Sequence, residues 1–205
     1  SKAAVNMGVK QTGAGSSYVD LAWDAQLGAG HYHTQFSQDG KNWIDMDNSS
    51  SPSESVYNLT QGASYYARVV AYKGSHYTGT HVMIGVSETA IVSTKPTEVS
   101  GLTQTAAGVN SVSMSWNASA GAASYVIYGY INYNWTQIGT SATNSATITG
   151  VAATTSTRFS VAAVKNVTGG TVTGDQCSGV EMKAIPIKVS RICLLYTSDA
   201  ADDGE

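Results

Sequence analysis

The histidines are the side chains of this sequence best suited to chemistry, because imidazole binds metals and exchanges protons near neutral pH. His31 and His33 lie two residues apart on a predicted strand, so both side chains should point to one face. Such a pair could begin a metal site. The spacing supplies no third ligand of Cys, His or Asp type. We therefore predict a solvated histidine pair and no metal site.

The residue patterns that usually support catalysis are missing from the sequence. There is no Gly-x-Ser-x-Gly turn and no glycine-rich phosphate loop between a strand and a helix. Only 14 acidic residues occur, and a small domain has no deep cleft in which two of them could flank a glycosidic bond. We predict that the chain is not an enzyme, has no catalytic residues and holds no cofactor.

Aromatic residues form the most prominent candidate binding surface. If Tyr125 and Ile127 face a core, the alternation of a strand turns Tyr128 and Tyr130 outward. An exposed aromatic strip can stack on sugar rings or anchor a protein partner. The alternative is that these rings fill space between strands or cover a domain junction. The candidate binding residues here are Tyr128, Tyr130, Tyr133 and Trp135.

A long loop gives a second candidate surface. Residues 73–85 are rich in Gly and Thr and are long for a hairpin connection. Long loops on a rigid scaffold often carry binding sites. The contact residues would be His76, Tyr77 and His81. The alternative is a hairpin whose two strands extend beyond the sheet.

Composition narrows the function classes further. The chain has 205 residues, a formal net charge of −3 and only 12% charged residues. This balance lacks the basic footprint of a nucleic-acid-binding protein. No apolar run approaches the roughly 20 residues that a membrane helix needs. We therefore predict neither nucleic-acid binding nor membrane insertion.

Five blocks of the sequence occur twice in the same order. Trp23 and Trp116 lie 93 residues apart, and Tyr32 and Tyr125 have the same offset. The remaining blocks repeat at an offset of 92 residues. The chain is therefore two tandem copies of one unit of about 90 residues, the size of an immunoglobulin-like domain. The predicted divisions are a domain at 1–94, a domain at 95–187 and a tail at 188–205.

Each repeated block has the alternation of a strand. Val19, Leu21 and Trp23 alternate with more polar neighbours, and glycine-containing turns separate the blocks. No stretch has convincing helical periodicity. Short alternating strands between turns predict an all-β fold of two tandem immunoglobulin-like β-sandwiches.

Both copies resemble fibronectin type III domains, particularly those of secreted bacterial surface proteins and glycoside hydrolases. In the first copy the resemblance is carried by Leu21-Ala-Trp23, residues 32–43, Leu59 to Tyr65 and residues 68–71. It implies that the Tyr65 hydroxyl pins the preceding loop to the backbone. The second copy has Thr157 at that position. The expected structural core residues are Trp23, Tyr32, Tyr65, Trp116 and Tyr125.

The carboxyl-terminal residues depart from this pattern. Residues 193–203 resemble the translation of a sequencing adaptor, so we exclude them from the fold and expect the tail to be unstructured. Cys177 then remains as a small buried hydrophobic residue, with pairing to Cys193 as the alternative. The domains should therefore be stabilised by core packing and not by a disulfide framework.

The resemblance implies a non-catalytic spacer and adhesion module within a larger secreted or surface protein. The alternative is a carbohydrate-binding accessory module of a polysaccharide-degrading enzyme. The expected location is extracellular or at the cell surface. The expected partners are a protein or polysaccharide there and flanking domains of the same chain.

Overall fold

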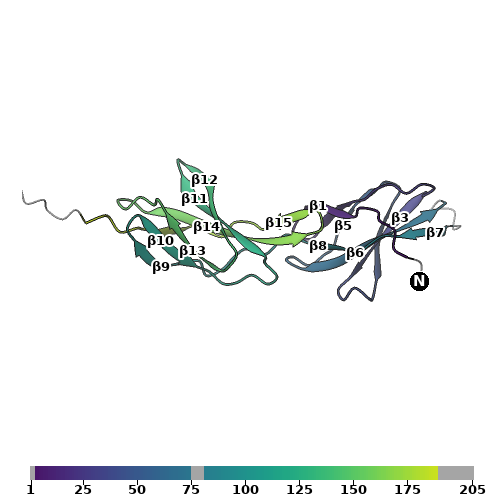
Figure 1. Cartoon of the computed structure of the whole chain (residues 1–205), viewed down its shortest axis with the longest axis horizontal. Helices are drawn as coiled ribbons and strands as arrows, with labels where there is room; N and C mark the ends of the chain where they lie inside the picture. Colours follow the sequence, from purple (N-terminus) through teal and green to yellow (C-terminus); the bar gives the residue numbers. More distant parts are fainter. Residues whose placement is uncertain (1–2, 75–80, 189–205) are drawn as a thin grey trace, which may run out of the picture.

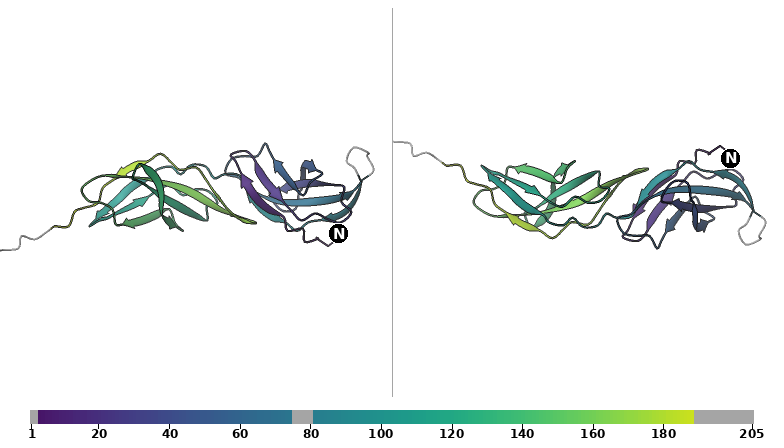
Figure 2. Two further views of the ribbon diagram at one scale, coloured as in Figure 1. Left: turned by 90° about the horizontal axis from the view of Figure 1, so that it is seen from above. Right: turned by 90° about the horizontal axis from the view of Figure 1, so that it is seen from below.

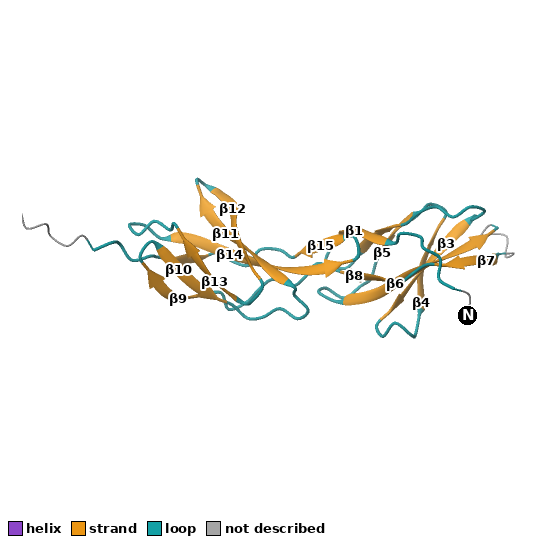
Figure 3. Ribbon diagram, in the orientation of Figure 1, coloured by secondary structure: helices purple, strands orange, loops and turns teal. Residues whose placement is uncertain are grey.

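The computed structural model describes residues 3–74 and 81–188, and all regular elements in these ranges are β-strands (Figures 1 and 3). The strands form two bodies that lie end to end along the long axis of the molecule (Figures 1 and 2). The two ends of the described chain, coloured purple and yellow, lie toward opposite ends of this axis (Figure 1). The described residues contain no helix that is long and apolar enough to cross a membrane.

The first body, formed by β1 to β8, has two antiparallel sheets. One has the strand order β1-β2-β5, and the other has the order β4-β3-β6-β7 with β8 also paired to β6. The strands are β1 (Lys10–Ala14), β2 (Val19–Ala22), β3 (His31–Ser37), β4 (Ile44–Ser49), β5 (Ser53–Val56), β6 (Ser64–Lys73), β7 (Val82–Val86) and β8 (Ala90–Ser93).

The second body, formed by β9 to β16, repeats this arrangement. Its sheets have the orders β13-β10-β9 and β12-β11-β14-β15, with β16 also paired to β14. The strands are β9 (Thr103–Gly108), β10 (Ser111–Ser115), β11 (Ser124–Ile131), β12 (Asn134–Ser141), β13 (Ser145–Thr149), β14 (Thr157–Val167), β15 (Gly170–Thr173) and β16 (Val180–Met182). The prediction of two tandem fibronectin-III-like β-sandwiches is confirmed. We refer to the bodies as the first and second sandwich.

Each sandwich buries its own hydrophobic core, and the same aromatic pair lies in both. The rings of Trp23 and Tyr32 are 5.4 Å apart at 66°, and those of Trp116 and Tyr125 are 5.3 Å apart at 67°. Such edge-to-face contacts add to the stabilisation that burial provides. Both tyrosine hydroxyls accept a hydrogen bond of 2.9 Å from a backbone N–H six residues earlier in the chain. The repeat in sequence is thus a repeat in packing.

A glutamine side chain joins the two sheets of each sandwich at one edge. The Gln11 amide donates to Ser93 O at 2.8 Å and accepts from Ser93 N at 2.9 Å. The Gln104 amide donates to Lys183 O at 2.9 Å and accepts from Lys183 N at 3.1 Å. Because these strands belong to different sheets, the side chain satisfies backbone groups that no ladder partner reaches.

The two copies differ at the loop before the long central strand. In the first sandwich, the Tyr65 hydroxyl accepts a hydrogen bond of 3.1 Å from Thr60 N, as the resemblance implies. In the second sandwich, Thr157 begins β14 and has no side chain that could reach so far. Both copies keep a backbone bond of 3.0 Å that holds the same loop, from Leu59 N in one and from Val151 N in the other.

Candidate functional site

The turn that joins β14 and β15 lies across one edge of the first sandwich (Figure 1). Thr168, in this turn, accepts a hydrogen bond from Gln11 N at its carbonyl oxygen and donates its own N–H to Ile91 O, both at 2.8 Å. Its hydroxyl accepts from Ile91 N, also at 2.8 Å. One residue of the second sandwich therefore bridges β1 and β8 of the first.

Two glycines of the second sandwich permit this close approach. A Cβ added at Gly169 would lie 2.9 Å from Lys10 Cβ and 3.1 Å from Gln11 O, and the residue has a φ of +103°. A Cβ added at Gly174 would lie 2.8 Å from Pro96 O. Larger residues at either position would force the backbones apart, so the contact requires glycine.

Lys165 extends the junction on the β14 side. Its side chain is buried, with 5% of its surface exposed, and its ammonium donates to Gly62 O and to Ser64 Oγ of the first sandwich. Burial lowers the pKa of Lys165. A second cation, Lys95, forms an ion pair with Asp175 at 2.6 Å. That pair is largely exposed and contributes at most about 1 kcal/mol, so directional hydrogen bonds define the junction.

The β11–β12 hairpin stands out from the second sandwich (Figures 1 and 3). Tyr130 is paired across the strands with Trp135, and their rings are 5.3 Å apart at 61°. The outer edge of the Trp135 ring lies close to the backbone before β16, since a Cβ added at Gly179 would be 2.9 Å from Trp135 Cη2. Trp135 therefore supports Tyr130, which is 40% exposed.

The tip of this hairpin is a two-residue turn with an unusual sequence. Asn132 and Tyr133 have φ values of +50° and +62°. Positive φ at both central residues is typical of a type I′ turn, where glycine is favoured at the second position. Tyr133 occupies that position and is 94% exposed. A bulky residue is thus held in the left-handed region with its ring in solvent.

The four aromatic residues predicted to bind a partner therefore differ in their exposure to solvent. Tyr130 and Tyr133 are accessible, whereas Tyr128 and Trp135 are half-buried against the sheet. The equivalent tryptophan of the first sandwich has another environment, because the Arg68 guanidinium lies 4.1 Å from the Trp43 ring centre. The recurrence of this tryptophan therefore does not create a second exposed hairpin.

The corresponding connection of the first sandwich is a six-residue loop between β3 and β4, longer than the two-residue turn of the second sandwich. The Asp39 carboxylate accepts hydrogen bonds of 2.8 Å from the backbone of Lys41 and Asn42. These bonds hold the pKa of Asp39 far below its usual range. The carboxylate is thus occupied in shaping the loop.

The histidines form a packed group, which corrects the prediction of a solvated pair. His31 is buried, stacks on Tyr72 with ring centres 5.1 Å apart, and its Nδ1 lies 2.9 Å from Gly74 O. The rings of His33 and His81 lie 5.3 Å and 5.3 Å from that of His31. The β3–β6 pairing brings Tyr72 over His31, so tertiary contacts replace water around the imidazole.

No group of three or more His, Cys, Asp or Glu residues within ranges 3–74 and 81–188 could hold a metal ion. Of the loop residues predicted as contacts, His81 is described and is exposed. His76 and Tyr77 lie outside the described residues. The histidine group therefore acts in the described structure as part of the aromatic packing at the end of the first sandwich.

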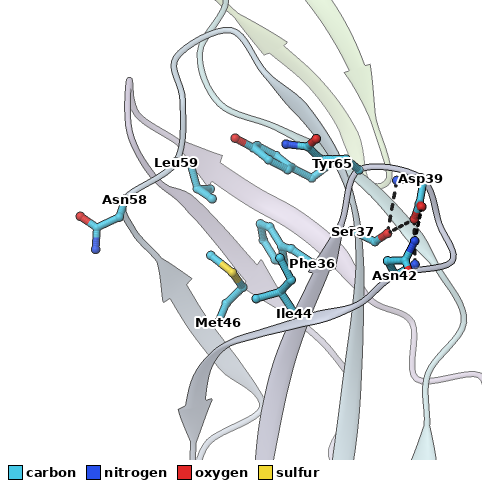
Figure 4. A pocket seen from close by; sticks show the side chains of 10 residues that line it. Phe36, Ser37, Asp39, Asn42, Ile44, Met46, Asn58, Leu59 and Tyr65 are labelled. Carbon is cyan, nitrogen blue, oxygen red and sulfur yellow. Dashed lines mark hydrogen bonds between the residues drawn. The ribbon is translucent and has the colours of Figure 1, made fainter.

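Each sandwich also has a groove on its surface. In the first it measures about 500 Å³ and is lined by Phe36, Ile44, Met46, Leu59 and Tyr65 (Figure 4). The second has a groove of about 480 Å³ in the equivalent place. Neither lining contains two acidic residues, so neither provides the paired carboxylates of a glycosidase.

Cys177 is buried and is not part of a disulfide. Its sulfur accepts a hydrogen bond of 3.3 Å from Val161 N, so it fills the core of the second sandwich. Cys193 lies outside the described residues.

The junction residues are the feature that sequence reasoning missed. The sequence Thr-Gly-Gly at 168–170 is typical of a turn, but it does not reveal what lies against that turn. The spacing between repeats shows that two domains are adjacent in the chain, and only the tertiary structure shows which edges meet.

Comparison with known proteins gives solved structures alone. No family model and no curated protein matches the chain. A two-domain fibronectin type III segment from chicken tenascin is similar over 86% of this chain and 97% of that chain, at 15% identity and a TM-score of 0.42. The FN1–FN3 domains of chicken CNTN1 are similar over 89% of this chain and 68% of that chain, at 14% identity and a TM-score of 0.48.

Proposed function

We propose that this chain is a non-catalytic spacer segment of a larger protein, in which two sandwiches are held in one relative orientation. The observation that carries the proposal is the triple hydrogen bond of Thr168 to Gln11 and Ile91. A segment of this kind keeps whatever lies beyond it at a fixed distance and angle. The described part of the chain offers surface area for adhesion and no enclosed catalytic cleft.

The connection between the sandwiches supports this role. Lys95 N donates to Gly15 O at 2.9 Å, Gly62 N donates to Lys95 O at 3.0 Å, and Pro96 contacts Gly174. Flexible linkers have a solvated backbone, whereas this one is hydrogen-bonded on one side and packed on the other. Bending therefore requires several contacts to break together.

The location and partners follow from the same proposal. A surface built from Ser, Thr, Asn and Gly with few charges suits exposure outside the cell, where the partners would be a protein or a polysaccharide. Flanking domains of the same chain would be the parts that the spacer separates.

The test is a distance measurement between spin labels placed on the two sandwiches. Thr168→Gly removes the hydroxyl bond and loosens the turn, so the distribution of distances should broaden at least twofold. The matched control is Thr155→Gly, which changes an exposed loop residue before β14, at the opposite end of that strand from Thr168, and should leave the distribution narrow. A broad distribution in the unchanged protein would contradict the proposal.

A second candidate function is carbohydrate binding at the β11–β12 hairpin. It is favoured by the exposed Tyr133 ring at a strained position and by the supported Tyr130 ring, because aromatic faces stack on the apolar faces of sugars. Asn132 and Asn134 place uncharged amides beside these rings, which suits a neutral polysaccharide.

Affinity electrophoresis through gels that contain neutral polysaccharides tests this candidate. The Tyr130→Ala/Tyr133→Ala variant should lose retardation, whereas Tyr57→Ala, an exposed tyrosine of the first sandwich, should keep it. The candidate fails if no polysaccharide retards the unchanged protein, or if the double variant is retarded equally.

A further inference from the structure

The second sandwich repeats, at its far end, the edge that the first sandwich presents to the junction. Gln104 occupies the position of Gln11, and each glutamine makes the same amide bonds to the last strand. Glu181 occupies the position of Ile91, since the two are paired with equivalent residues of β14 and β6. The hydrogen-bonding edge that receives Thr168 is therefore present twice.

At the far end this edge has no occupant among the described residues. Gln11 and Ile91 each bond to Thr168, whereas Gln104 and Glu181 make no backbone bond outside the sheet ladders in residues 3–74 and 81–188. The chain follows the same path in both places, because Ile185 N donates to Gly108 O at 2.9 Å as Lys95 N does to Gly15 O. A proline comes next in each case, Pro96 or Pro186.

The far end differs from the junction in its polarity. Val109, Ile185 and Ile187 are exposed by 58%, 46% and 62%, and a backbone bridge joins Val109 to Ile185. The junction has Lys95 in place of Ile185, and Lys95 pairs with Asp175 of the second sandwich. An isoleucine in that position can bond to no carboxylate, so an apolar neighbour suits it better.

We propose that the far end of the second sandwich, formed by Gln104, Val109, Glu181, Ile185 and Ile187, is a docking surface for another β-sandwich of the same kind. The occupant is a hairpin turn like that of Thr168, which bonds to Gln104 and Glu181. Its residue opposite Ile185 is apolar, where the second sandwich itself has Asp175. This inference rests on the proposed spacer function, because it extends the same junction to a further unit.

The test adds a second β14–β15 turn to the full chain, so that it can dock on the proposed surface. The second sandwich has a core of its own that begins at Val99, and Lys188 corresponds to Glu98. A second copy of residues 99–188 is therefore placed directly after Lys188, with Asp175→Val in the added copy. Amide hydrogen exchange is then followed at Gln104 and Glu181 of the original second sandwich, in the extended and in the unextended chain. The amides of Gln11 and Ile91 serve as an internal reference for the existing junction.

Exchange at Gln104 and Glu181 should slow at least tenfold in the extended chain. Thr168→Gly in the added copy, or Ile185→Lys in the original sandwich, should reverse that slowing. If both amides exchange at the unextended rate while Gln11 and Ile91 stay protected, the docking surface is wrong and the spacer proposal stands. If Gln11 and Ile91 also exchange freely, both proposals are overturned.

Discussion

At the scale of single residues, Glu88 ties the amino-terminal segment to the first sandwich. Its two carboxylate oxygens accept hydrogen bonds from Met7 N at 2.8 Å and from Val9 N at 2.9 Å. Burial alone would raise the pKa of Glu88, but the backbone donors outweigh it and lower the pKa below the ordinary value of 4.5. The carboxylate form therefore stabilises the folded state.

Glu88→Gln should reduce the free energy of unfolding of the first sandwich by about 1 to 2 kcal/mol at neutral pH, because one backbone donor loses its acceptor. A lowered pKa contributes stability that is complete above pH 4.5 and is lost as the pH falls through the folded value. Urea denaturation at pH 7 and pH 3 should show the difference shrinking in acid. Glu98→Gln, at an exposed position, is the control.

At the scale of elements, the β11–β12 turn exposes the Tyr133 ring at a cost in the stability of the second sandwich. Tyr133 at a φ of +62° carries a steric cost that glycine avoids. Tyr133→Gly should therefore stabilise the second sandwich by about 0.5 to 1 kcal/mol, as measured by thermal unfolding. The same variant should weaken retardation by neutral polysaccharides.

The matched variant for this turn is Tyr133→Ala, which removes the ring and keeps a Cβ. It should lose retardation without the gain in stability. A destabilised Tyr133→Gly variant would show that the ring makes packing contacts and that the turn is not strained.

At the scale of the whole molecule, Lys165 makes the junction depend on pH. Burial lowers its pKa from the ordinary 10.5, so the separated state binds more protons between the lowered value and 10.5. Docking should therefore strengthen as the pH rises through that interval. The distance distribution between the sandwiches should narrow from pH 7 to pH 10.

Lys165→Met keeps the apolar stem and removes the titrating group. Its distance distribution should be broader at pH 7, because Gly62 O and Ser64 Oγ lose their donor, and should not change with pH. Narrowing with pH in this variant would assign the effect to another group.

The sequence by itself determined the strands and their duplication. Alternation around Trp23 and Trp116 is a local property, since successive side chains of a strand point to opposite faces. The repeated offsets then fix two copies of one sandwich, and the outward direction of Tyr130 follows from the burial of Tyr125 and Ile127. Alternation depends only on neighbouring residues, and the repeat is visible when two segments of the sequence are compared, so neither requires tertiary contacts.

Only the tertiary structure decided which edges and rings meet. His31 became buried because Tyr72 and His81, distant in sequence, cover it. Thr168 gained its role because the edge of another sandwich lies beside it. These contacts join residues that lie between 41 and 157 positions apart in the chain. At the junction they run mainly through backbone groups, which every residue except proline carries in the same form. No residue type therefore marks them in advance.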